Sequence, residues 1–144
     1  MSVIIRTATT EDSPTITNLS EQLGYRSDNK VVLDRIDDIL LDTDNCLFVA
    51  DLNHEVVGWI HGFYALRVVT DPFVEIGGLV VDSKHRNVGV GRLLIEAVYD
   101  WARSKNCYNI RLRSNIIRID SHKFYDRLGF SCNKQQKIFY KTLV

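Results

Sequence analysis

An apolar, strand-like run that leads through a glycine-rich turn into an amphipathic helix constrains this chain more than any other feature. Residues 74–81 are mostly aliphatic and β-branched, which is typical of a buried strand. The following apolar positions change to a helical period and share one face: Val90, Leu94, Ala97, Val98 and Trp101. The segment therefore predicts a strand, a short loop and a helix in direct succession.

The turn between this strand and this helix has the composition of an anion site. Glycine lets the backbone approach a ligand without a Cβ in the way. The first N–H groups of a helix lack internal partners, and the positive end of the helix dipole lies behind them. Arg86 and Arg92 add formal charge at the two ends of the turn. The turn therefore predicts a phosphate or pyrophosphate site.

Comparison with known phosphate loops narrows the choice. A P-loop requires four residues between its glycines and then Gly-Lys-Ser/Thr, which this chain lacks. A dinucleotide fingerprint requires a third glycine where this chain has Leu94. The pattern Arg/Gln-x-x-Gly-x-Gly/Ala after a strand is matched in full by Arg86, Gly89 and Gly91. In this loop the chain resembles the GNAT superfamily of acyl-CoA-dependent N-acetyltransferases.

A second segment resembles the closing motif of the same superfamily. Residues 121–130 read Ser-His-Lys-Phe-Tyr-Asp-Arg-Leu-Gly-Phe, which is similar to the family's Ala/Ser-His-x-Phe-Tyr-x-x-x-Gly-Phe helix. One helix and one strand separate the two motifs, as in the family, and the resemblance covers essentially the whole chain. It implies an α/β fold with a mostly antiparallel central sheet flanked by helices, and acetyl-CoA as co-substrate. The implied cofactor contacts are Leu79, Val80, Val81, Arg86, Asn87, Val88, Gly89, Val90, Gly91, Arg92, Asn115, Ser121 and Phe124.

The central strand changes phase along its length. Val74 and Ile76 share one face by parity, whereas Leu79 and Val81 share the other, and Gly77-Gly78 lies at the change. A β-bulge at the two glycines explains the change, and burial of the strand on both faces is the alternative. A bulge would bend the strand away from the next parallel strand and open a slot. The resemblance implies that the backbones of Leu79 and Val81 hold the pantetheine there.

The implied reaction is attack of a primary amine on a thioester carbonyl, which requires a base and benefits from an acid at the leaving thiolate. By position, Tyr125 matches the family's general acid, and a packed aromatic is its alternative role. Glu75 aligns with the glutamate base of the histone-acetylating branch, and its alternative role is pairing with a nearby arginine. His61 and His122 are rival bases. A strand N–H near Leu79 is expected to stabilise the oxyanion.

Charge is unevenly spread although the net charge is zero. Residues 11–44 hold nine acids and three bases, a balance of −6, and residues 86–144 hold twelve bases and four acids, a balance of +8. We expect the basic part to receive the anionic cofactor and the acidic part a cationic small-molecule amine, such as an aminoglycoside or a polyamine. Alternatives are a peptide, protein or amino-acid acceptor, and a non-catalytic acyl-CoA sensor. We expect no nucleic-acid partner because the bases are not interleaved with exposed aromatics.

The remaining features predict one cytoplasmic domain over residues 1–144. No apolar run reaches the roughly 18 residues of a membrane helix, and the first residues lack a signal-peptide pattern. The three cysteines show no metal-ligand spacing and suggest reduced thiols. Expected strands are 2–7, 46–52, 55–66, 74–81, 109–114 and 134–143, and expected helices begin near residues 10, 28, 89 and 120. The last strand is a natural pairing edge, so we expect a homodimer.

Overall fold

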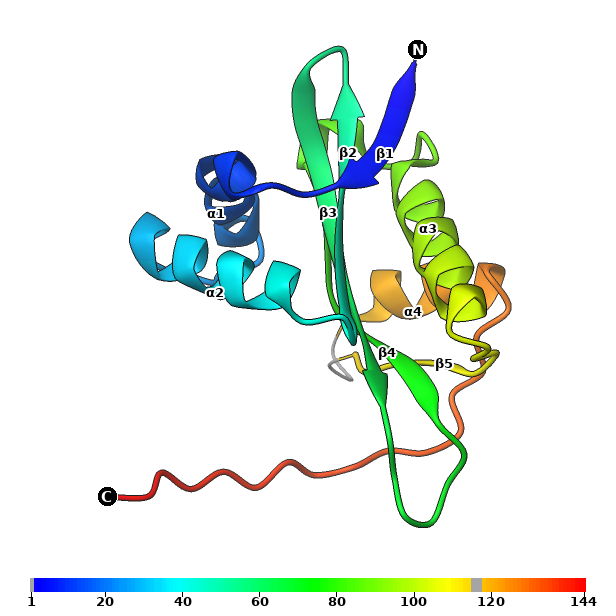
Figure 1. Ribbon diagram of the computed structural model, residues 1–144. Coiled ribbons are helices and arrows are strands. Elements are labelled where there is room, and N and C mark those ends of the chain that lie inside the picture. Colours follow the sequence, from blue (N-terminus) through cyan, green and yellow to red (C-terminus); the bar gives the residue numbers. More distant parts are fainter. Residues whose placement is uncertain (1, 115–117) are drawn as a thin grey trace. The chain divides into compact units, whose positions relative to one another are not determined.

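The structure, a computed structural model, describes residues 2–114 and 118–144 and divides into two compact units. One unit ends at Arg113 and the other begins at Ser114. The first holds a five-stranded sheet whose strands lie in chain order (Figure 1). The strands are β1 (Val3–Thr7), β2 (Asn45–Leu52), β3 (Glu55–Ala65), β4 (Phe73–Val81) and β5 (Ile110–Leu112).

Strands β1 to β4 pair antiparallel, and β5 joins β4 in parallel. The expected, mostly antiparallel central sheet is therefore confirmed. The β2–β3 hairpin turns at Asn53-His54, whose φ values of 50° and 71° are both left-handed. A two-residue hairpin turn of type I′ requires positive φ at both positions, which Asn tolerates better than most residues.

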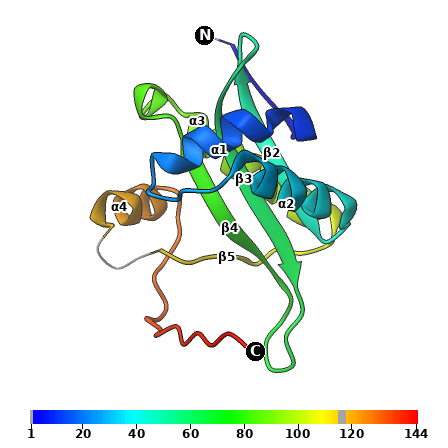
Figure 2. The ribbon, with the colours of Figure 1, turned by 90° about the vertical axis from the view of Figure 1, so that its left-hand side faces the viewer.

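Helices cover both faces of the sheet. Helices α1 (Ser13–Glu21) and α2 (Asn29–Leu41) lie on one face, and α3 (Val90–Ser104) lies on the other (Figures 1 and 2). The first face buries a cluster of Ala8, Ile16, Ile36, Leu47 and Val49. On the second face, α3 buries Val90, Leu94, Ile95, Val98 and Ala102. The predicted helical face is confirmed at three of its five positions, while Ala97 and Trp101 lie at its half-buried margins.

The expected bulge in the central strand is present. His61 of β3 pairs with Gly78, whereas the next residue, Gly62, pairs with Ile76, so Gly77 is the extra residue. Pairing of β4 with β5 stops at Ile76, directly before the bulge. Because an extra residue reverses the alternation of side chains, the bulge places Val74 and Val81 on the same face despite their parity. The bulged, splayed central strand is therefore confirmed.

The second unit contains helix α4 (Ile119–Arg127), followed by a segment without helix or strand. The helix ends in a Schellman motif: Phe130 N–H donates to Tyr125 O at 3.0 Å, and Gly129 N–H donates to Asp126 O at 3.0 Å. Gly129 has a φ of 89°, as this position requires. The predicted strand over residues 134–143 is wrong. Its apolar side chains, including Phe139, are exposed, and no partner strand pairs with it among the described residues.

Asp12 ties the first strand to the first helix. Its carboxylate accepts hydrogen bonds from Arg6 Nη1 at 2.8 Å, Arg6 Nη2 at 2.9 Å and Thr9 N–H at 2.8 Å. The Arg6 guanidinium is the main reason why the pKa of Asp12 lies below its ordinary value. The group is only 8% exposed, so the paired carboxylate is a structural element.

Asp12 should make the protein sensitive to acid. A carboxylate whose pKa is depressed by folding stabilises the fold above its unfolded pKa, and this contribution is lost as pH falls through the folded pKa. We expect the free energy of unfolding to fall below about pH 4. Asp12→Asn should cost about 2 kcal/mol at pH 7 and flatten this dependence. Urea unfolding between pH 3 and 7 measures both effects. Asp37→Asn, at an exposed position of α2, is the control and should leave the acid dependence intact.

Candidate active site

The glycine-rich loop lies between β4 and the start of α3. Gly89 is the N-cap of α3 and has a φ of 89°, and a Cβ placed on it would have no neighbour within 4 Å. Leu93 N–H is bonded to Gly89 O at 3.1 Å, so the N–H groups of Val90, Gly91 and Arg92 precede the first intrahelical bond. The loop therefore presents open backbone donors at the positive end of a 15-residue helix.

The predicted loop residues differ in exposure. Arg86, Asn87, Val88 and Arg92 are exposed, whereas Val90 is 1% exposed and packs into the core. Asn87 has a positive φ of 64°, so two left-handed residues shape the turn. Arg86 Nε donates to Val81 O at 3.3 Å and links the loop to the end of β4. Val90 has only its backbone to offer a ligand.

The slot beside β4 exposes alternate backbone groups. Asp82 N–H donates to Val57 O at 2.8 Å, so the polar groups of Val80, two residues earlier, also face β3. Those of Leu79 and Val81 then face the edge that β5 has left. Val80 is 4% exposed and turns its side chain into the core. Among the described residues, Val81 O is bonded to Arg86 Nε, so the slot offers the N–H and C=O of Leu79 and the N–H of Val81.

A side-chain clamp that the sequence did not indicate joins α1 to the entrance of the loop. Gln22 Nε2 donates to Asp82 Oδ1 at 2.9 Å, and Gln22 Oε1 accepts from Ser83 N–H at 3.0 Å. The second carboxylate oxygen of Asp82 lies 2.7 Å from His85 Nδ1. These bonds, led by the one from Gln22, lower the pKa of Asp82. A single glutamine at a helix end belongs to no sequence motif or apolar repeat, so the sequence alone does not mark it as a site residue.

Glu75 lies in β4 on the same face of the sheet as α1 and α2, and it is held by arginine. Its Oε1 accepts from Arg111 Nε at 2.8 Å and Nη2 at 2.6 Å, and Arg113 Nε lies 3.7 Å away. The Arg111 guanidinium also lies 4.0 Å from the centre of the Phe73 ring. The structure therefore shows the arginine pairing that was the alternative for Glu75. Register explains it, because Glu75 pairs with Arg111 across β4 and β5.

His61 lies on the same face, beside the bulge. Its Nε2 is 2.7 Å from Asn45 Oδ1, and burial lowers its pKa. A Cβ on Gly77 would lie 2.9 Å from His61 Nδ1, and one on Gly78 would lie 2.7 Å from the Trp59 ring. Two aromatic side chains thus pack where the bulge glycines leave space.

Helix α4 carries the remaining predicted residues in the second unit. The Tyr125 ring lies 5.5 Å from Phe124 and 6.1 Å from Phe130, measured between ring centres. Burial raises the pKa of Tyr125, so its hydroxyl keeps its proton. Ser121 and His122 are half-buried in the first turns of the helix. Asn115, a predicted cofactor contact, falls outside the described residues.

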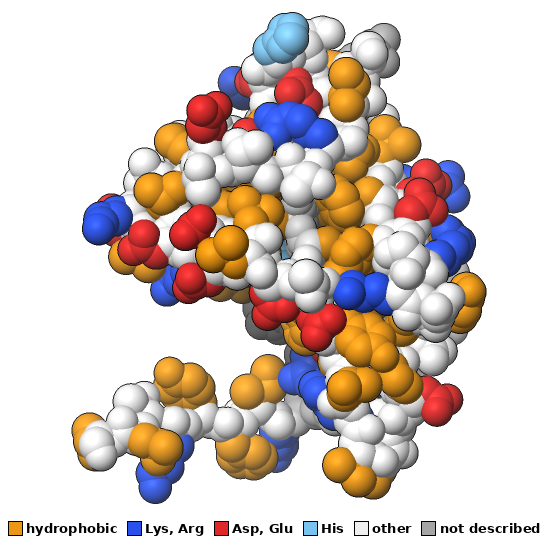
Figure 3. Space-filling view, viewed as in Figure 1, with side chains coloured by type: hydrophobic (Ala, Val, Ile, Leu, Met, Phe, Trp, Pro, Cys, Tyr) orange, Lys and Arg blue, Asp and Glu red, His pale blue; other side chains and the backbone are white. Residues whose placement is uncertain are grey.

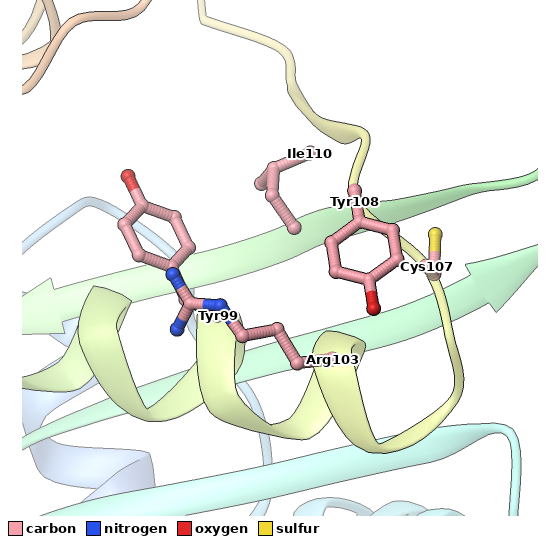
Figure 4. Close-up of a pocket in the computed structure, with 5 residues that line it drawn as sticks. All are labelled: Tyr99, Arg103, Cys107, Tyr108 and Ile110. Atoms are coloured by element: carbon pink, nitrogen blue, oxygen red, sulfur yellow. The ribbon is translucent and has the colours of Figure 1, made fainter.

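Other chemistry is limited in the described part of the chain. A shallow hollow of about 190 Å³ lies between the C-terminal half of α3 and the segment leading into β5, away from the glycine loop (Figure 4). Burial raises the pKa of the Cys46 thiol to about 12, so it remains protonated. No group of three potential metal ligands occurs among residues 2–114 and 118–144. No helix in these ranges is long and apolar enough to cross a membrane.

Comparison with known proteins agrees with this geometry. A model of the acetyltransferase (GNAT) family matches residues 13–130. The chain belongs to the GNAT family. It is 30% identical over 128 residues to streptothricin acetyltransferase of Escherichia coli, covering 87% of this chain and 71% of that protein. It also matches N-acetylaspartate synthetase of Xenopus tropicalis at 33% identity over 60% of this chain, but spans only 31% of that protein.

Solved structures confirm the GNAT fold. An aminoglycoside N-acetyltransferase in complex with the bisubstrate analogue CoA-S-monomethyl-acetylneamine superimposes with a TM-score of 0.89 at 22% identity, covering 99% of this chain and 100% of that chain. The aminoglycoside 6'-N-acetyltransferase of Acinetobacter haemolyticus gives 0.86 at 20% identity, over 98% and 99% of the two chains. At these identities the likeness establishes the fold alone.

Proposed function

We propose that the chain transfers an acetyl group from acetyl-CoA to a primary amine by direct attack in a ternary complex. One observation carries the proposal: a bulged strand turns the backbone groups of Leu79 and the N–H of Val81 toward the slot, and the same strand leads into an open glycine loop at a helix N-terminus. A pantetheine arm needs backbone partners along an extended path, and a pyrophosphate needs N–H donors and positive charge. The two features follow each other in the order in which CoA presents these groups.

The proposed reaction assigns its chemistry to the chain's own residues. The amine nitrogen attacks the thioester carbon, the new C–N bond forms, and the C–S bond breaks. Leu79 N–H is proposed to stabilise the oxyanion, and Tyr125 is proposed, from the resemblance of its motif, to protonate the leaving thiolate. The clamp of Gln22, Asp82 and Ser83 holds the entrance of the loop against α1.

The acidic N-terminal third favours a polycationic acceptor. Acidic side chains are spread over the lobe formed by α1 and α2, on the left in Figure 3, and Asp34, Asp37 and Asp38 of α2 are exposed. This lobe covers the face of the sheet that carries Glu75 and His61. Two similar proteins are described as acting on streptothricin and on aminoglycosides. We therefore propose an aminoglycoside or another polyamine ahead of a peptide or amino-acid acceptor.

The test is release of free CoA thiol from acetyl-CoA across aminoglycosides, streptothricin, polyamines, amino acids and lysine peptides. Turnover with polycationic small molecules supports the proposal, and turnover with peptides alone moves the acceptor to the second class. Silence with a rise in melting temperature on adding acetyl-CoA favours a non-catalytic acyl-CoA sensor. Silence without that rise overturns the cofactor site.

We also propose that the chain forms a homodimer in a reducing, cytoplasmic environment. Cys46, Cys107 and Cys132 are unpaired, which suits reduced thiols. The side chains of Ile138, Phe139 and Tyr140 are 77%, 90% and 91% exposed, and a contiguous apolar segment of this kind favours association. Light scattering at micromolar concentration should give twice the mass of 16.6 kDa. A monomeric mass removes the proposal.

A further inference from the structure

Glu75 is poorly placed to take a proton from the acceptor amine. One of its oxygens is bonded twice by Arg111, and Arg113 lies nearby. The carboxylate is thus held as the partner of two arginines. The side chain is only 13% exposed, and Arg111 is fixed from the other side by the Phe73 ring. The pair is better suited to shaping the site than to proton transfer.

His61 has the properties that Glu75 lacks. Asn45 Oδ1 accepts a hydrogen bond from Nε2 at 2.7 Å, so the neutral ring carries its proton on Nε2 and leaves a lone pair on Nδ1. Nδ1 has no hydrogen-bond partner in the described part of the chain. It is also not one of the fully buried side-chain atoms that lack a partner there. Nδ1 therefore keeps some exposure to solvent, beside Gly77, which has no side chain.

Nδ1 lies beside Gly77, where β4 separates from β5 and the slot begins. Gly77 is the exposed bulge residue, and a Cβ at that position would lie 2.9 Å from Nδ1 and cover it. The glycine loop follows the end of β4, so a pantetheine arm bound to Val81 and then Leu79 runs back toward Gly77-Gly78. The thioester end of the arm thus approaches the bulge, and His61 lies next to the bulge.

We propose that His61 is the general base of the reaction, taking a proton from the acceptor amine on Nδ1, and that Asn45 is a positioning residue that fixes its tautomer. This inference rests on the proposed function. The amine loses one proton to Nδ1 as its nitrogen bonds to the carbonyl carbon, and the imidazolium then releases that proton to solvent. The lowered pKa of His61 keeps the ring neutral near pH 7, which the role requires.

The charged groups named below, on the elements next to His61, are paired with one another. On β4 and β5, Glu75 is neutralised by Arg111. At the start of β2, Asp44 pairs with Lys105 at 3.4 Å. Burial is the cause of the shift in the pKa of His61, so the ring should respond strongly to a single charge placed beside it.

Three variants test the assignment by thiol release. His61→Gln should lower kcat by about 10²-fold with unchanged acetyl-CoA affinity, because glutamine fills similar space but cannot take a proton. Asn45→Asp should move the acidic limb of the kcat profile to higher pH by about 1 unit, since a carboxylate beside Nε2 favours the imidazolium. His54→Gln, in the β2–β3 turn, is the matched control and should behave like the wild type.

A measurement independent of turnover separates this inference from the proposed function. Long-range ¹H–¹⁵N spectra of the histidine rings at pH 7 should show His61 neutral with its proton on Nε2. A proton on Nδ1 or a charged ring overturns the assignment whether or not an acceptor is known. Wild-type turnover in His61→Gln overturns it too, while leaving the acetyltransferase proposal standing. A wild type that releases no thiol with any amine counts against the proposed function.

Discussion

Gly89→Val is expected to abolish acetyl-CoA binding while the chain stays folded. Gly89 has a φ of 89°, a region that β-branched residues rarely adopt. No atom lies within 4 Å of a Cβ placed there, so the cost is backbone strain of about 1–2 kcal/mol, which a domain of this size survives. A shift of the loop relieves this strain. The free N–H groups that precede Leu93 then no longer point at the same ligand.

The measurement is calorimetric titration with acetyl-CoA, together with the shift in melting temperature that the ligand causes. We expect Kd to rise by at least about 10²-fold, which corresponds to about 2.7 kcal/mol. Gly24→Val is a matched control because Gly24 has a φ of 87° and also has no neighbour within 4 Å of its Cβ position. It should lose similar stability and keep binding the cofactor. Retained binding in Gly89→Val would show that the loop is only a tight turn.

Tyr125→Phe is expected to lower kcat by about 10²–10³-fold, with acetyl-CoA affinity nearly unchanged. The phenylalanine ring keeps the contacts with Phe124 and Phe130, and the Schellman hydrogen bonds of Tyr125 use only its backbone. Only the hydroxyl is lost, and with it the proton assigned to the leaving thiolate. Burial raises the pKa of Tyr125, so wild-type activity should show no loss from phenol ionisation below about pH 10.

Steady-state thiol release under saturating acetyl-CoA measures this effect. Tyr108→Phe, at an exposed tyrosine before β5, is the control and should turn over like the wild type. Equal turnover in Tyr125→Phe would assign the ring to packing alone. A large rise in KM for acetyl-CoA with unchanged kcat would instead make Tyr125 a cofactor contact.

Local sequence determined the turns, the helix ends and the bulge of the central strand. The turn at Asn53-His54, the cap at Asp28 and the helix end at Gly129 form because each residue type satisfies a local backbone requirement. The phase change at Gly77-Gly78 predicted the bulge, since side chains in a strand must alternate. The two family motifs also lie within single stretches of chain, and the family match confirms the family that they indicate.

The last predicted strand shows where pattern reading fails. Residues 134–143 include Ile138, Phe139 and Tyr140, residue types that favour a strand, but a strand forms only where a neighbouring edge offers hydrogen-bond partners. The described structure gives this segment no such partner, so its propensity is not expressed. The pairing of Glu75 with Arg111 has the same origin, since it depends on which residues of two distant strands stand side by side.

The site around His61 was decided by tertiary structure alone. Counting back from the Asn53-His54 turn pairs Cys46 with His61 and puts Asn45 on the opposite face of the sheet. In the structure Ala50 pairs with Gly58 and Asp51 pairs with Val56, so Val57 of β3 is an extra residue and Leu47 pairs with His61. That one-residue shift turns Asn45 to the side of His61, because side chains alternate with a period of two. The sequence by itself determined the loop, the bulge and helix α4. The register, which is the sum of weak pairings along two whole strands, decided which side chains meet.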